Sequence, residues 1–145
     1  MGRSTDAILF YGFHAGEGAW DEILGGDWET TYVGKKGVLP PPVEYDTDEH
    51  KAQHRTFWSA RSALVTAEPC TIGTHCSSEC PMPFVCIRAS KTRARRGHPE
   101  EIKPLAIAHE HEWSAPRWDA QLKAFCELMG IPWQTPGWWI VSDWS

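Results

Sequence analysis

The sequence predicts an α+β fold in which a mixed or antiparallel sheet packs against one long C-terminal helix. Short apolar segments near both ends of the chain, AILFYGF at 7–13 and WWIVSDW at 138–144, have the composition of strands buried on both faces. Between 114 and 130 one apolar stripe recurs at helical spacing, formed by Trp118, Leu122, Phe125, Cys126 and Met129. Strands at both ends around one long helix favour a sheet with the helix on one side.

The helix carries end signals as well as a stripe. Ser114 is a plausible N-cap, Pro116 falls in the first turn, and Gly130 follows the last apolar residue. Towards the N-terminus, residues 20–24 have the spacing of a short helix, and WETTYV at 28–33 fits either a helix turn or a strand.

The middle of the chain is less regular. Residues 37–43 contain three consecutive prolines and read as an extended connector. The charged stretch that follows fits a solvated loop or the exposed face of a helix, so residues 40–56 are interpreted as a loop or insertion. Residues 61–67 and 70–75 are compatible with strands, and 84–89 is a clearer strand, with a turn around Pro81 and Pro83 that makes a hairpin.

Length and charge restrict the class of protein. A chain of 145 residues fits a single domain, 1–145, which buries roughly two-thirds of its unfolded surface and needs no metal or disulfide to hold its core. A net charge of −5 argues against duplex nucleic acid as a partner. No apolar run approaches the ~20 residues of a membrane span, and the N-terminus lacks a signal-peptide layout, so we expect a cytosolic protein with reduced thiols.

Four of the five cysteines lie in CTIGTHCSSECPMPFVC at 70–86. Zinc ligands usually come in pairs separated by two to four residues, and only Cys76 and Cys80 meet that rule. His75 adjoins Cys76, but neighbours on a strand point to opposite faces, which argues against a shared metal or a thiol–imidazole pair. Two further histidine pairs, His50 with His54 on a helix face and His109 with His111 on a strand face, are alternative metal ligands that lack an obvious third partner.

A basic run stands out in this acidic chain. Five cations fall within residues 88–96 without an intervening acid: Arg88, Lys91, Arg93, Arg95 and Arg96. The simpler interpretation of this patch is an exposed hairpin kept soluble by its charge. Arginine forks also suit phosphates or carboxylates, so with an aromatic surface the patch fits a nucleotide-like ligand or an acidic protein. The sequence contains no phosphate-binding glycine loop, paired-carboxylate motif or serine elbow.

Several stretches together resemble a family of small uncharacterised accessory proteins of tailed bacteriophages. They are AILFYGF, THCSSECPM, RRGHPEEI, WDAQLKAFCELMGI and PGWWIVSDWS. In that family the His-Cys-Ser and Pro-Met elements are typical, whereas Cys70, Cys80 and Cys86 are departures, which weakens the zinc hypothesis and draws attention to His75 and Cys76. The resemblance implies phage origin and an accessory role in the host cytoplasm.

The leading hypothesis is therefore a non-enzymatic binding protein, active in counter-defence, that sequesters a phosphate-containing signalling ligand or occludes a host defence protein. Its predicted ligand-binding residues are Tyr11, His75, Arg88, Arg93, Arg95 and Arg96, and we predict no catalytic residue, cofactor or metal. One alternative is a small zinc module or metal-dependent enzyme built on residues 70–86 and the histidine pairs. Another is a virion or assembly component. The nine tryptophans also make a homodimer credible.

Overall fold

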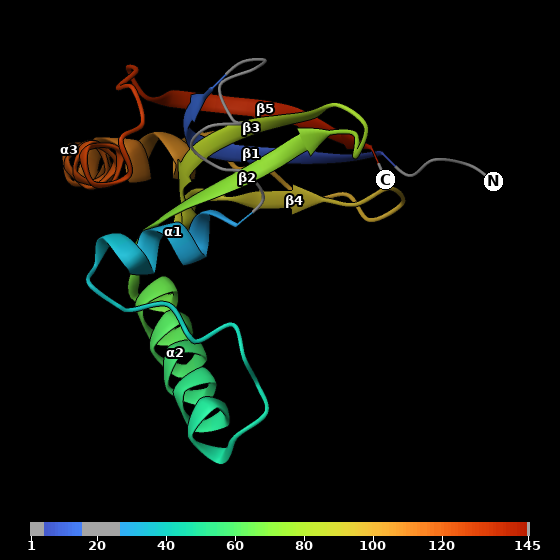
Figure 1. Cartoon of the computed structure of the whole chain (residues 1–145). Helices are drawn as coiled ribbons and strands as arrows, with labels where there is room; N and C mark the ends of the chain where they lie inside the picture. The colour runs from blue at the N-terminus through green and yellow to red at the C-terminus, as the bar shows by residue number, and fades with distance from the viewer. Residues whose placement is uncertain (1–4, 16–26, 145) are drawn as a thin grey trace.

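The computed structural model describes residues 5–15 and 27–144, and it has the predicted α+β architecture (Figure 1). The sheet contains β1 (Thr5–His14), β2 (Cys70–Cys76), β3 (Pro81–Ile87), β4 (Thr92–Ala94) and β5 (Gly137–Trp144). The helices of the described residues are α1 (Trp28–Lys35), α2 (Asp48–Ala67) and α3 (Pro104–Met129), with one 3₁₀ turn, η1 (Arg88–Ser90). The expected short helix at residues 20–24 lies outside the described residues.

The sheet closes on itself around its first strand. On one edge, β1 pairs antiparallel with β5 from Thr5↔Trp144 to Gly12↔Gly137, and on the other edge it pairs with β4 and then β3. Strand β3 forms a hairpin with β2, and β2 meets β5 through the single parallel pair Cys76↔Asp143. Because β1, β3, β2 and β5 form a cycle, they enclose a small interior.

Apolar side chains fill that interior. Ile8, Phe10, Phe84, Cys86 and Val141 form a buried cluster, in which the rings of Phe10 and Phe84 stack with their centroids 4.3 Å apart. So few strands leave room only for side chains, and even these need a neighbour without a Cβ. A Cβ on Gly73 would lie 2.4 Å from the Phe84 ring.

The larger core lies between the outer face of the sheet and the helices. From the sheet, Tyr11, Phe13, Val85 and Ile87 enter this core, because their positions alternate with those that face the interior. The stripe of α3 packs against them: Trp118, Leu122, Phe125, Cys126 and Met129 are all buried, as predicted. Gly130 ends the helix at φ 72°, in the left-handed region that glycine favours.

The start of α3 corrects the prediction. The helix begins at Pro104, so Ser114 is not its N-cap; the Ser114 hydroxyl instead donates to Glu110 Oε1 at 2.7 Å from inside the helix. Pro116 lies in the helix interior, where one backbone hydrogen bond is lost. His109 and His111 are therefore helical and do not share a strand face. The first ten helical residues are mostly exposed, which explains why no apolar stripe marks them.

Helix α2 supplies the second correction. Residues 61–67 are its last turns and not a strand, and of the interpreted loop at 40–56 only residues 40–47 lie outside a helix. The Thr47 side chain caps the helix by accepting from the His50 backbone N–H, with Asp48 and Glu49 in the first turn. Residues 28–33, which fit either structure, are helical.

Candidate interaction surface

The cysteine segment forms the predicted hairpin of adjacent strands, but its turn lies at residues 77–80, because Pro81 and Pro83 belong to β3. Its thiols are distributed over different environments. Cys70 is buried in the larger core and Cys86 in the closed interior, whereas Cys80 is exposed at the turn; all five cysteines are free. Burial raises the pKa of Cys86 to about 12 and that of Cys126 to about 11, the opposite of what an activated nucleophile requires. Within residues 5–15 and 27–144, no three His, Cys, Asp or Glu side chains gather as a metal site.

His75 is buried beside His14, where three strands meet. Its Nδ1 lies 3.1 Å from the Ser142 carbonyl oxygen, which only accepts, so Nδ1 is the donor in this hydrogen bond. Its Nε2 lies 2.7 Å from His14 Nε2, and the two rings share one hydrogen bond. This pair links β1, β2 and β5 at the seam of the closed sheet. Burial, and then the neighbouring His75, lower the pKa of His14.

Tyr11 faces away from that interior, into the larger core. Its hydroxyl donates to Asp119 Oδ1 at 2.6 Å, and its ring packs against His111, Trp118 and Trp138. Burial and the bond to Asp119 raise the pKa of Tyr11. Tyr11 and His75 thus lie on opposite faces of the sheet and do not contribute to one pocket.

Two of the predicted arginines, Arg88 and Arg93, bind acceptors within the protein. Arg88 donates from Nη2 to the Val65 carbonyl at 3.0 Å. Arg93 Nη1 lies 2.9 Å from Asp6 and 3.0 Å from Asp143, so two carboxylates neutralise it. Arg95 and Arg96 are exposed beyond β4, and the Arg96 backbone N–H donates to Asp6.

The six predicted ligand residues consequently do not form a single site. Tyr11, His75 and the arginines point into different parts of the molecule, and Arg88 and Arg93 already have acceptors. Ligand binding by each of the six residues stays a prediction.

A different feature offers a hollow surface: the segment of residues 38–67, which we call the arm. It consists of an extended, proline-containing segment without regular secondary structure, followed by α2. In Figure 1, α2 extends away from the sheet. Of the twenty residues of α2, only Phe57 and Val65 are buried. Most of this helix therefore contributes little to the core.

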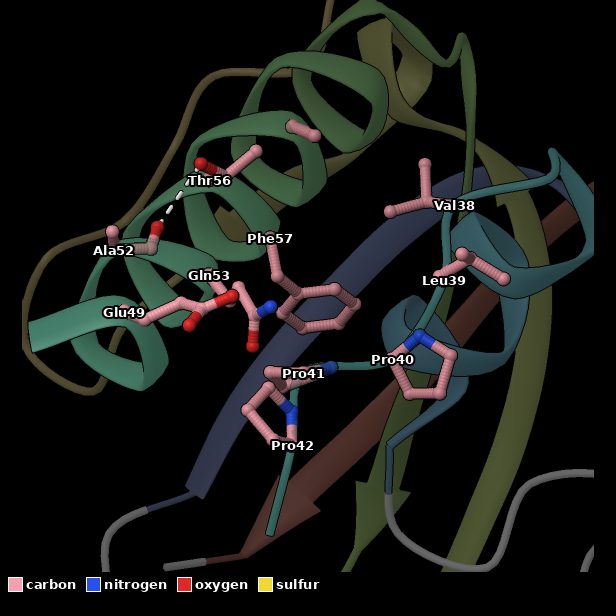
Figure 2. Close-up of a pocket in the computed structure, with 11 residues that line it drawn as sticks. Val38, Leu39, Pro40, Pro41, Pro42, Glu49, Ala52, Gln53, Thr56 and Phe57 are labelled. Carbon is pink, nitrogen blue, oxygen red and sulfur yellow. Dashed lines mark hydrogen bonds between the residues drawn. The ribbon is translucent and has the colours of Figure 1, made fainter. Parts of the chain in front are cut away.

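A groove runs between the two parts of the arm (Figure 2). One wall is Val38 with three consecutive prolines, and the other is the face of α2 around Ala52 and Thr56, with the Phe57 ring directed towards the prolines. Its volume is about 720 Å³. Prolines lack N–H donors and hold an extended conformation, so this wall is apolar and preorganised.

The arm also carries large apolar side chains that remain in solvent, and of these Leu39 lines the groove. Leu39 is 83 % exposed, Val43 97 % and Trp58 50 %. The Trp58 ring is held in place by the Arg61 guanidinium, whose carbon lies 4.9 Å from the ring centroid. Arg61 also pairs with Asp27 at 2.9 Å and with Glu29 at 3.0 Å, which ties the arm to the start of α1.

Two sequence features mark this surface: the three prolines, interpreted from the sequence only as a connector, and the adjacent aromatic residues Phe57 and Trp58, which are not among the predicted site residues. That they form one groove is evident only from the structure, in which α2 lies beside the proline connector. Comparisons with protein-family models, with curated proteins and with solved structures find no match for this chain. In the parts of the chain that the structure describes, no helix combines the length and apolar character needed to cross a bilayer.

Proposed function

We propose that this chain is a binding protein of the phage accessory type, which occludes a host defence protein through its arm. One observation carries the proposal: the arm holds a preorganised apolar groove of about 720 Å³ and also exposes Leu39, Val43 and Trp58, although few residues of its helix α2 are buried in the core. Exposed apolar patches of this kind mark interaction surfaces.

The arm suits a protein surface better than a nucleotide. A phosphate ligand needs cations directed into a pocket, whereas this groove is lined by prolines, alanines and Phe57 with Glu49 as its charged residue. Trp58, fixed by Arg61, and Tyr45, packed on His54, are the residue types that dominate binding energy at protein interfaces.

The acidic residues at the tip of the arm favour a partner with positive charge. Residues 44–49 carry four acids and no lysine or arginine: Glu44, Asp46, Asp48 and Glu49. A partner with a basic rim around an apolar centre complements this arrangement, and such a complex associates more slowly as salt increases. The resemblance to phage accessory proteins supports a host protein as that partner and the host cytoplasm as the place of action.

The test is affinity purification from host cells with two matched variants. Leu39→Asp combined with Trp58→Ala alters the arm at exposed positions, and Trp113→Ala removes an equally bulky side chain that is 73 % exposed on α3. We expect one host protein to be recovered with the wild type and with Trp113→Ala, and to be lost with the arm variant, because truncating a central Trp typically costs about 2 kcal/mol or more.

The same variants then go into a phage plating assay on a host that carries the defence system to which the recovered protein belongs. The arm variant should lose protection while circular dichroism shows an unchanged fold. If the arm variant retains the partner and protects as well as the wild type, or if no host protein is recovered with either, the proposal is wrong.

A further inference from the structure

A second hollow lies far from the arm, between the first turns of α3 and the outer face of β4, β1 and β5. Three adjoining cavities of about 310, 320 and 440 Å³ share Ile102, Ile107 and Trp138 as lining residues. We call them together the α3 cavity. Each falls in the size range of small-molecule sites, which begins at roughly 300 Å³.

The sequence explains why this space stays open. Its floor is formed where β1 and β4 pair Ala7 with Ala94 and Leu9 with Thr92, so three of these four side chains are small. Above them, only Ile107 among the first ten residues of α3 is even half-buried. Beside them, Ile140 of β5 is 74 % exposed. The helix therefore passes over the sheet without filling the space beneath it.

One wall of the α3 cavity is aromatic and fixed in place. The indole Nε1–H of Trp138 donates to His111 Nδ1 at 3.3 Å, and the Trp138 ring packs edge-on to Tyr11 with centroids 5.4 Å apart. Tyr11 is itself anchored by its 2.6 Å bond to Asp119 and by its contact with Trp118. These contacts hold the ring of Trp138 in one orientation before any ligand arrives, which lowers the entropic cost of binding.

The charges that line the cavity are mainly negative. Glu100, Glu101 and Glu110 contribute to its walls, against Lys103 as the cation among the lining residues. Glu110 is held by the Ser114 hydroxyl at 2.7 Å. An aromatic face attracts cations through its quadrupole, so the indole and the carboxylates both favour a positively charged ligand.

We propose that the α3 cavity binds a small organic cation with a hydrophobic body, such as an aryl- or alkylammonium ion. The apolar body occupies the floor over Leu9 and beside Ile140, and the cationic head lies between the Trp138 ring and the carboxylates of Glu101 and Glu110. This site is independent of the arm and of any protein partner bound there.

The probe is benzyltrimethylammonium, compared with neopentylbenzene, in which carbon replaces the charged nitrogen, and with phenylmethanesulfonate as the anion. The readout is the indole N–H signal of Trp138 in ¹H–¹⁵N spectra, assigned by its absence in Trp138→Phe. We expect the cation to shift this signal saturably and to bind at least about tenfold more tightly than either comparison compound.

Variants of the lining residues test whether the cation binds specifically in the α3 cavity. Glu101→Gln with Glu110→Gln should weaken the cation, whereas Glu112→Gln, on the same helix but outside the lining residues, should not. Ala94→Leu fills the floor and should abolish binding while the remaining signals keep their dispersion. An unmoved Trp138 signal, equal affinity for the neutral isostere, or indifference to the double Gln variant overturns the proposal. Concentration-dependent dimerisation that Ile140→Asp abolishes also overturns it, because the cavity is then an interface between two copies.

Discussion

Replacing Gly12 by alanine should strongly destabilise the closed sheet, because this residue lies where β1 passes from β5 to β3. A Cβ built on Gly12 falls 1.9 Å from the Val85 carbonyl oxygen and 2.7 Å from the Cys86 Cα, both backbone atoms that cannot rotate away. Ordinary contact begins near 3.4 Å, so the strands would have to separate by about 1.5 Å and lose the register Gly12↔Cys86. Overpacking against movable side chains costs about 1–3 kcal/mol, so we expect at least about 3 kcal/mol here.

Gly34→Ala is the matched control, since the same added methyl meets nothing within 4 Å on helix α1. Alanine in a helix is favoured over glycine by about 0.8 kcal/mol, so this variant should be more stable than the wild type. With a slope of about 2 kcal/mol per molar urea, the unfolding midpoint should fall by about 1.5 M for Gly12→Ala and rise by about 0.4 M for Gly34→Ala. Equal midpoints for Gly12→Ala and the wild type would show that the strands do not close as described.

Three further predictions concern ionisable groups. In native protein at pH 8, iodoacetamide followed by mass spectrometry should modify exposed Cys80 first and Cys76 next, and should leave the three buried thiols unmodified; early loss of a buried thiol would contradict the packing. Because burial holds the pKa of His14 below 6.5, the unfolded chain binds more protons in acid, so the free energy of unfolding should fall below about pH 6.5 and fall less steeply in His14→Gln. Burial and Glu68 raise the pKa of Tyr32 above 10.0, so stability should decline above pH 10 as the unfolded chain loses this proton, and Tyr32→Phe should flatten that decline in urea titrations.

The strands and the helix stripe were predictable because burial leaves a strong compositional trace. Strand β1 is apolar at both alternating positions since one set, including Phe10, faces the interior and the other, including Phe13, faces the helices. The stripe from Trp118 to Met129 is continuous because all its residues are buried in the larger core. Where a helix buries little, as in α2 and the start of α3, the periodic pattern fades, so the sequence leaves the first part of α2 open between a loop and a helix and predicts too late a start for α3.

The candidate site was less accessible to sequence reasoning for a related reason. Whether an arginine is available to a ligand depends on partners distant in the chain: Arg93 is neutralised by Asp6 and Asp143, which come from the two terminal strands. Likewise, the role of His75 depends on its contact with His14, and the need for glycine at position 73 depends on the Phe84 ring. Closure of the sheet decides these contacts, and the single pair Cys76↔Asp143 that completes it leaves no pattern in the sequence.

Site-specific photo-crosslinking in infected cells tests the role of the arm most directly. Benzoylphenylalanine replaces Leu39, which is 83 % exposed beside the groove, or Trp113, which is 73 % exposed on α3. We predict that position 39 crosslinks to one host protein and that position 113 does not. Crosslinks of a host protein to position 113 with none to position 39 would place the contact surface elsewhere and contradict the account.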